Sequence, residues 1–353
     1  MLTNLVATTD IAVRHRAPAT VGAMTDTATP PSRPLGRSGL RVSAVGLGCN
    51  NLGRPGAATE SQAGSDRVVG AALDAGITLF DVADTYGATP GLAEERLGKA
   101  LGSRRDDIVV ATKFGMDMQG ANGPDFGARG SRRYIRTAVE ASLRRLDTDR
   151  IDLYQFHTPD PGTPIDETLS ALDDLVRAGK VRYLGHSNRA GWQIAQAEYV
   201  ARELGVGRFV SAQNHYNLTD RRAELEVLPA AREFGLGVLP YFPLANGLLT
   251  GKYAAGVAPE GSRLARTRQH LLEDAVSPTL QRYSDFARTR EVSEVTVAIG
   301  WLLAQAPVAS VIAGATSVEQ VEANAAAPAW MPTADDLAEL DVIFPPPAPI
   351  APY

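Results

Sequence analysis

Short apolar runs and amphipathic stretches alternate along most of the chain. Eight apolar runs, rich in valine and isoleucine, are typical of buried strands and span residues 43–49, 77–83, 108–114, 151–157, 182–188, 210–216, 237–244 and 310–316. Segments between them repeat apolar residues at helical spacing, as in 64–76, 91–102, 131–147, 166–180 and 291–306. This alternation predicts βα units and a parallel sheet.

Eight such units favour an α/β fold whose sheet closes on itself, a (β/α)8 TIM barrel, for which about 250 residues is typical. The stretch "PLGRSGLRV" has glycine turns between short extended pieces and predicts an N-terminal hairpin closing one end of the barrel. Long loops on the C-terminal face, 116–130 and 254–284, are expected to shape a pocket. We expect one barrel domain over 34–343, a disordered arm over 1–33 and an extended proline-rich tail over 344–353.

Composition and net charge exclude several classes of binding partner but do not distinguish between folds. The 353 residues carry a net charge of −5 with no long basic run, which argues against binding nucleic acid or an anionic membrane. No window has the about 18 to 20 apolar residues of a membrane span, and Asp10 interrupts the only apolar stretch of a poor secretory signal. A single cysteine, Cys49, and five histidines without metal-ligand spacing favour a cytoplasmic protein with no disulfide and no structural metal.

Polar residues gather where the predicted strands end. Asp81, Asp84 and Tyr86 follow the second strand, Lys113 ends the third and His157 ends the fourth. The active sites of barrels form at this face, so we expect these side chains to converge. Each also has a structural interpretation alone: Lys113 could reach solvent, His157 could be a core histidine, and Asp84 could cap a turn. A buried ammonium needs a carboxylate, which Asp81 could supply.

A tyrosine beside a lysine has a specific chemical meaning. A phenol has an ordinary pKa of about 10, and a nearby ammonium favours the phenolate, which eases protonation of a developing alkoxide. An aspartate, lysine and tyrosine, with a histidine to orient a carbonyl, suit hydride transfer from a nicotinamide to an aldehyde or ketone. No GxGxxG fingerprint follows a predicted strand, which fits a barrel better than a Rossmann domain.

At these motifs the chain resembles the aldo-keto reductases, over residues 35–328. The resemblance is carried by "FDVADTYGATPGLAEERLGKAL", "VVATKFG", "SLRRLDTDRIDLYQFHTPDP", "TPIDETLSALDDLVRAGKVRYLGHSN", "YFPLANGLLTGKY" and "VIAGATSVEQVEAN". It implies a catalytic tetrad of Asp81, Tyr86, Lys113 and His157. Tyr86 would be the general acid in reduction, Lys113 would lower its pKa and Asp81 would hold Lys113. His157 would hydrogen-bond the carbonyl oxygen.

The same resemblance implies contacts with a nicotinamide coenzyme, from the carboxamide and ring through the pyrophosphate to the adenosine. The implied residues are Ser187, Asn188, Gln213, Tyr241, Pro243, Leu244, Lys252, Arg263, Gly314, Thr316, Gln320 and Asn324. The loop 314–317 lacks the basic residue with which many family members grip the 2′-phosphate. Lys252 and Arg263 would replace it, as in the branch similar to potassium-channel beta subunits. NADPH is therefore expected, with NADH as the alternative.

Two other functions compete with a carbonyl reductase acting on a small molecule. One is a slow-turnover sensor or scaffold subunit of the same fold that binds the nucleotide, although such subunits tend to replace the residue at His157. The other is a metal-dependent barrel isomerase or hydrolase, which needs several carboxylates and histidines at strand ends, where this chain has Lys113. Neither the carbonyl substrate nor the oligomeric state follows from the sequence.

Overall fold

The computed structural model describes residues 29–253 and 277–348. Its centre is a parallel sheet of eight strands in the order β10-β3-β4-β5-β6-β7-β8-β9. These strands span Val45–Gly48 (β3), Leu79–Asp81 (β4), Val109–Phe114 (β5), Ile151–Phe156 (β6), Val181–Ser187 (β7), Phe209–Gln213 (β8), Gly237–Val238 (β9) and Val311–Gly314 (β10). All eight predicted strands are confirmed, with ends that shift by a few residues.

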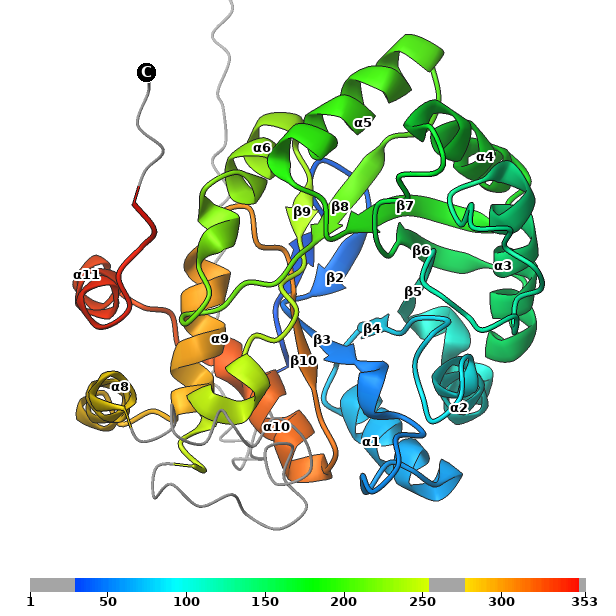
Figure 1. The fold of residues 1–353 in the computed structure, drawn as a ribbon. Coiled ribbons are helices and arrows are strands. Elements are labelled where there is room, and N and C mark those ends of the chain that lie inside the picture. Colours follow the sequence, from blue (N-terminus) through cyan, green and yellow to red (C-terminus); the bar gives the residue numbers. More distant parts are fainter. Residues whose placement is uncertain (1–28, 254–276, 349–353) are drawn as a thin grey trace, which may run out of the picture.

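The sheet curls into a barrel (Figure 1). β10 pairs with β3 along one edge, and the amide of Ile312 in β10 donates to the carbonyl of Pro240, just beyond β9, over 3.1 Å. β9 is shorter than predicted because Pro240 and Pro243 have no N–H to continue a ladder. The predicted (β/α)8 TIM barrel is thus confirmed.

Helices follow the strands and surround the barrel (Figure 1). They span Gln62–Asp74 (α1), Leu92–Leu101 (α2), Arg132–Leu146 (α3), Ile165–Arg177 (α4), Gly191–Leu204 (α5), Val227–Phe234 (α6), Glu294–Ala304 (α9) and Val318–Ala326 (α10). In α3, Ser131 caps the first turn by accepting from the amide of Tyr134, and Ile135, Val139 and Leu146 recur at helical spacing on the buried face. Such faces form one core with the outer side chains of the strands.

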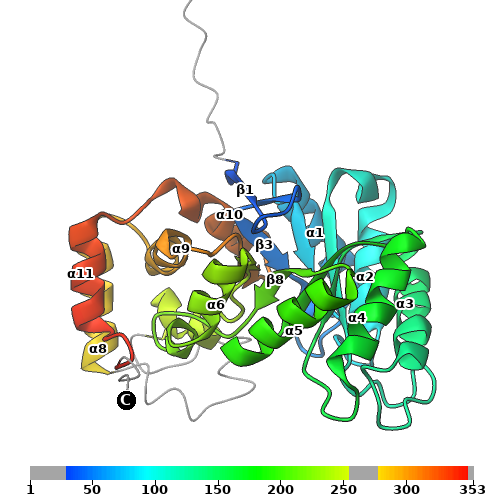
Figure 2. The same ribbon diagram turned by 90° about the horizontal axis from the view of Figure 1, so that it is seen from above.

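Two helices stand apart at one edge of the molecule, beside α9. They are α8 (Pro278–Thr289) and α11 (Ala334–Ile343), which contact each other (Figures 1 and 2). α8 corrects the expectation of a loop through residue 284. Its proline occupies the first turn, where a missing N–H is harmless, and Ser277 caps the helix by accepting from the amide of Leu280. The rest of that expected loop, 254–276, lies outside the described residues.

The predicted hairpin closes the N-terminal end of the barrel. Its strands, β1 (Ser32–Pro34) and β2 (Arg41–Ser43), pair antiparallel. Leu35 and Val42 are fully buried and pack with Leu79 and Ala111 from the barrel interior. β1 includes the last residues of the predicted arm, whose residues 1–28 lie outside the described part. Because apolar side chains fill this end, a ligand has to enter at the opposite, C-terminal end.

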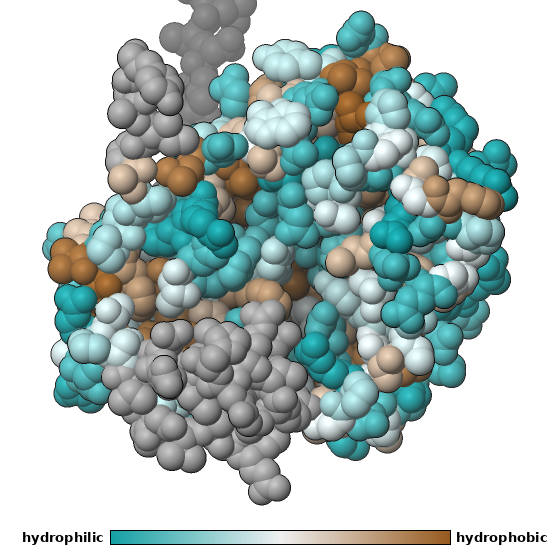
Figure 3. Space-filling model, in the orientation of Figure 1, coloured by the Kyte–Doolittle hydropathy of each residue, from teal (hydrophilic) through white to brown (hydrophobic). Residues whose placement is uncertain are grey.

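The surface seen in Figure 3 is mainly hydrophilic, with small separate apolar patches. Within 29–253 and 277–348, no helix combines the length and the apolar composition needed to cross a membrane.

Candidate active site

A cavity of about 760 Å³ lies at the C-terminal ends of the strands. Its volume is within the range of about 300 to 1,000 Å³ common for small-molecule sites. The predicted site residues that line it are Asp81, Tyr86, His157, Ser187, Asn188, Gln213, Tyr241, Pro243, Leu244, Lys252, Gly314, Thr316, Gln320 and Asn324. Lys113 is fully buried behind this wall, and Arg263 lies outside the described residues.

Lys113 and Asp81 form a buried ion pair. The Nζ atom of Lys113 lies 2.6 Å from Oδ2 of Asp81 and also donates to the carbonyl of Val82 over 3.0 Å. Asp81 is opposite Ala111 in the register of β4 and β5, and Lys113 follows Ala111 by two positions, so both side chains lie on the same side of the sheet. Burial opposes the ammonium, but Asp81 and the nearby Tyr86 outweigh it and raise the pKa of Lys113. The lysine therefore stays charged.

Two glutamines hold the other oxygen of Asp81. Nε2 of Gln213 donates to Oδ1 over 2.8 Å, and Nε2 of Gln155 donates to the same atom over 3.0 Å. Gln155 is level with Lys113 in the β5–β6 register and is fully buried. Sequence reasoning missed Gln155, although its place beside Lys113 on the next strand was a usable signal.

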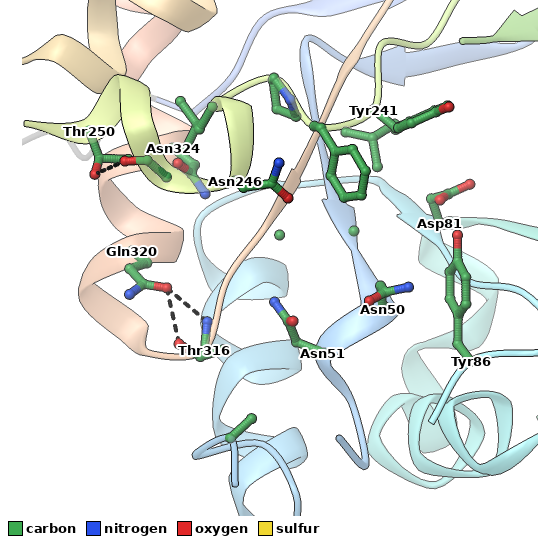
Figure 4. Close-up of a pocket in the computed structure, with 18 of the residues that line it drawn as sticks. Asn50, Asn51, Asp81, Tyr86, Tyr241, Asn246, Thr250, Thr316, Gln320 and Asn324 are labelled. Atoms are coloured by element: carbon green, nitrogen blue, oxygen red, sulfur yellow. Dashed lines mark hydrogen bonds between the residues drawn. The ribbon is translucent and has the colours of Figure 1, made fainter. Parts of the chain in front are cut away.

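A tight turn carries Tyr86 from the end of β4 to the cavity. The amide of Tyr86 donates to the carbonyl of Ala83 over 3.1 Å. Gly87 follows with φ +116°, and a Cβ there would lie 2.8 Å from Cβ of Leu92, so only glycine fits. The Tyr86 hydroxyl is 3.4 Å from Nζ of Lys113 and is directed toward Asp81 (Figure 4).

Burial and Lys113 act on the pKa of Tyr86 in opposite directions. Burial raises the pKa of this phenol, and the Lys113 ammonium and hydrogen bonds from Lys113 and Asn50 lower it only in part. The net direction is upward because burial is the largest cause, while Lys113 itself lowers the pKa of Tyr86 as the sequence predicted. At neutral pH the phenol keeps its proton, as a proton donor must.

His157 lies edge-on to Tyr86. Their ring centroids are 5.9 Å apart at an interplanar angle of 82°. Burial, followed by the charge of Lys113, lowers the pKa of His157 to about 3. The imidazole is therefore neutral at physiological pH and carries one donor and one acceptor nitrogen. Its Nδ1 atom has no partner among the described residues.

A second group of hydrogen bonds lies beside this tetrad. Asn188 adopts φ +58°, a left-handed conformation that asparagine tolerates, and its Nδ2 donates to the carbonyl of His157 over 2.9 Å. Its Oδ1 accepts from the Tyr241 hydroxyl over 2.8 Å. The Ser187 hydroxyl donates to the carbonyl of Gln213 over 2.7 Å. The expected carboxamide-binding residues therefore hold one another at the wall of the cavity.

Tyr241 is supported from both its ring and its hydroxyl. The ring of His215 stacks on it, with centroids 5.4 Å apart and an angle of 8°. His215 in turn lies 3.0 Å from a carboxylate oxygen of Asp220 through Nδ1. This stack fixes the plane of the Tyr241 ring.

The far end of the cavity is built around the start of α10. Gln320 accepts through Oε1 from the amide of Thr316 over 2.9 Å, and Ser317 caps the helix (Figure 4). A helix N-terminus favours an anion. Lys252 is the basic residue that lines the described part of the cavity, and no basic side chain occurs in 314–317.

Three asparagines that line the cavity were not predicted from the sequence. Asn50, Asn51 and Asn246 lie between Tyr86 and Gln320 (Figure 4). The first two follow β3, so the strand-end rule could have found them. The Oδ1 atoms of Asn50 and Asn246 are buried without a partner among described residues, which fits a ligand rich in hydrogen-bond donors such as a dinucleotide. No group of three or more histidine, cysteine or carboxylate side chains in the described part is placed to hold a metal ion.

Asp84 has a further role besides the hydrogen bond that it accepts from the backbone of Thr85 in the turn. It is fully buried on the outer side of the barrel, where its Oδ2 accepts from Nδ2 of Asn122 over 2.9 Å. The turn brings Tyr86 to the cavity and directs Asp84 away from it.

Comparisons with known proteins show the family to which the chain belongs. The "Uncharacterized oxidoreductase YrpG" of Bacillus subtilis is 41% identical over 293 residues, which cover 81% of this chain and 87% of that protein. The "L-glyceraldehyde 3-phosphate reductase" of Escherichia coli K12 is 34% identical over 304 residues, 83% and 86% of the two chains. The "Probable voltage-gated potassium channel subunit beta" of rice is 38% identical over 300 residues, 82% and 88%. The model of the "Aldo/keto reductase family" matches residues 44–344, and the chain therefore belongs to this family of oxidoreductases.

Proposed function

We propose that the protein reduces an aldehyde or ketone to an alcohol, with a nicotinamide coenzyme as reductant and Tyr86 as proton donor. The observation that carries the proposal is the position of Lys113, whose Nζ lies 2.6 Å from Asp81 and 3.4 Å from the Tyr86 hydroxyl. A relative of 34% identity is named a reductase of an aldehyde, L-glyceraldehyde 3-phosphate, which supports a carbonyl substrate.

Each of the four residues has a separate role in the proposed reaction. When bound, the reduced nicotinamide supplies a hydride to the carbonyl carbon. Tyr86 donates its hydroxyl proton to the carbonyl oxygen, and the charged Lys113 stabilises the phenolate that remains. Asp81 keeps Lys113 charged and fixed. The neutral His157 donates a hydrogen bond to the same carbonyl oxygen and so holds the substrate beside Tyr86.

NADPH is the coenzyme we propose. Ser187, Asn188 and Gln213 would hold its carboxamide, and Tyr241 would contact the nicotinamide ring. Pro243, Leu244 and Lys252 would follow the pyrophosphate, while Gly314, Thr316, Gln320 and Asn324 would surround the adenosine. In the absence of a basic residue at 314–317, preference for the 2′-phosphate would depend on Lys252 and on Arg263.

A slow-turnover nucleotide-binding subunit is the alternative. The similarity to a probable potassium channel subunit beta favours it, whereas the intact His157 argues for turnover. The two functions differ in the number of coenzyme molecules that each protein molecule oxidises.

The test is a screen of carbonyl compounds, including short aldehydes, ketones, hydroxyaldehydes and sugars, with NADPH and with NADH. Loss of the absorbance of the reduced nicotinamide is followed over time. Repeated turnover with at least one carbonyl class, faster with NADPH, is expected. Oxidation that stops after one equivalent of coenzyme would favour the alternative, and tight binding of neither coenzyme would contradict both.

A further inference from the structure

A buried polar network lies on the outer side of the barrel, behind the turn that carries Tyr86. Asp84 and Glu94 are fully buried, and Asn122 is 3% exposed. Asp84 belongs to the Tyr86 turn, Glu94 to α2 and Asn122 to the loop 116–130. The proposed reaction uses none of these side chains, yet burying them requires specific partners.

Asn122 is the centre of this network. Its Nδ2 donates to Oδ2 of Asp84 over 2.9 Å, and the Tyr134 hydroxyl is 3.5 Å from the same nitrogen. Its Oδ1 accepts from a guanidinium nitrogen of Arg145 over 2.9 Å, while Nε of Arg145 pairs with Glu94 over 2.7 Å. One amide therefore joins the Tyr86 turn to helix α3, which carries both Tyr134 and Arg145.

Asp84 serves this network as a hydrogen-bond acceptor. The guanidinium of Arg145 pairs with Glu94 rather than with Asp84, and burial followed by the charge of Glu94 raises the pKa of Asp84 well above its usual range. Arg145 and Asn122 oppose this rise but do not reverse it. Asparagine has nearly the same shape and keeps an acceptor oxygen for Asn122, so it is the matched replacement for Asp84.

The loop that contains Asn122 also forms part of the cavity wall. Met116, at its start, lines the cavity. At its other end the amide of Gly130 donates to Asp160 over 2.7 Å, and the carbonyl of Gly130 accepts from Thr168 over 2.8 Å. Asn122 is the buried polar side chain between these ends, so its hydrogen bonds connect the middle of the loop to the barrel.

We propose that Asn122 is a positioning residue, which latches the loop 116–130 to Asp84 and so sets the distance between the Met116 wall and the Tyr86 hydroxyl. The proposal rests on the proposed function, because it concerns the substrate side of the same cavity. The coenzyme side is built by other strands, including Ser187 and Gln213. Loss of the latch therefore affects the fit of the carbonyl substrate and leaves the coenzyme in place.

Asn122→Leu is the variant that breaks the latch. The KM for the best carbonyl substrate is expected to rise about tenfold, the usual worth of one net hydrogen bond, with the coenzyme Kd unchanged within about twofold. Asp84→Leu should have the same effect, and the double variant should be no worse than either single one, because all three lack the same contact. Asp84→Asn keeps the acceptor and should behave as the parent.

A swapped variant keeps the test valid if the leucine variants fold poorly. In Asp84→Asn with Asn122→Asp, the new aspartate can accept from Arg145 and from the new asparagine, so the parent KM is expected. Amide hydrogen exchange gives a readout independent of activity. Exchange in 117–125 should be faster in Asn122→Leu than in Asp84→Asn, while the strands exchange as in the parent.

Three outcomes would contradict the proposal that Asn122 positions the loop. They are an unchanged KM in Asn122→Leu, an equal loss of coenzyme affinity and carbonyl affinity, or unchanged loop exchange. A parent protein that reduces no carbonyl compound would contradict the proposed function instead, and the exchange experiment would still decide whether Asn122 holds the loop.

Discussion

Nε2 of Gln213 donates to Oδ1 of Asp81 over 2.8 Å, so a side chain of the cavity wall also holds the carboxylate that pairs with Lys113. Gln155 donates to the same oxygen over 3.0 Å from a fully buried position. Both glutamines therefore hold Asp81, and of the two only Gln213 also lines the described cavity.

Gln155→Leu and Gln213→Leu should separate these functions. Each removes one donor from Asp81, and loss of a hydrogen bond to a charged group, about 1.5 kcal/mol, should slow turnover about tenfold. Only Gln213→Leu should also weaken coenzyme binding. Coenzyme titration by protein fluorescence, together with steady-state kinetics, measures both effects. Equal weakening of coenzyme binding in the two variants would mean that Gln213 has no direct contact with the coenzyme.

Lys113→Met should inactivate the enzyme and destabilise it. The variant leaves Asp81 as a buried carboxylate without its cation, which costs about 3 to 5 kcal/mol in free energy of unfolding. Adding Asp81→Asn should recover stability without activity, because the uncompensated charge disappears while Tyr86 still lacks its ammonium. Denaturant unfolding of the parent, single and double variants tests this, and a single variant as stable as the parent would argue against the ion pair.

The stability of the protein should fall in acid because of His157. Its pKa is lowered to about 3 in the folded protein, against an ordinary value of about 6.5, so below pH 6.5 the unfolded state binds the extra proton. Above about pH 6.5, His157 does not lower the free energy of unfolding. Below that pH, the free energy of unfolding falls as the pH decreases. Between pH 7.5 and 5 the loss should be about 2 kcal/mol. His157→Gln lacks this loss, so its free energy of unfolding should change less over the same interval, and an identical change would refute the neutral buried imidazole.

Coenzyme preference should depend on Arg263, which lies outside the described residues. A guanidinium binds a phosphate through two hydrogen bonds, so Arg263→Ala should weaken NADPH binding by about 1.5 to 3 kcal/mol and leave NADH binding nearly unchanged. Lys252→Ala, at the cavity wall, should have a smaller effect of the same kind. Dissociation constants for both coenzymes decide this. Equal losses would assign Arg263 to the shared pyrophosphate, and no loss would assign it to the solvated surface.

The barrel could be predicted because apolar runs and amphipathic segments alternate along the chain. Each strand is recognisable locally, from a short run of apolar residues. The positions of Asp81, Tyr86, Lys113 and His157 followed from the rule that barrel sites form at strand ends, combined with the resemblance to a family. α8 and α11 could not be found in this way, because they pack against each other outside the barrel repeat.

Three features of the candidate site depend on the folded structure and could not be predicted from the sequence. The raised pKa of Tyr86 depends on how completely the folded protein excludes water from its hydroxyl, a quantity that no local motif contains. Asp84 and Asn122 are separated by 38 positions in the chain, and only the tertiary fold brings them together. Asn188 could be recognised from its motif, but its left-handed φ could not.

Tyr86→Phe tests the central claim most directly. The ring stays and only the hydroxyl is lost, so the pocket shape and the coenzyme contacts should persist. We expect carbonyl reduction to fall by about a hundred- to ten-thousand-fold, the usual effect of losing a positioned acid, while the Kd for NADPH changes less than about twofold. Steady-state reduction of the best carbonyl substrate, with the Kd measured by fluorescence on the same preparation, gives the answer. Carbonyl reduction at the parent rate in this variant would contradict the account, because Tyr86 would then donate no proton.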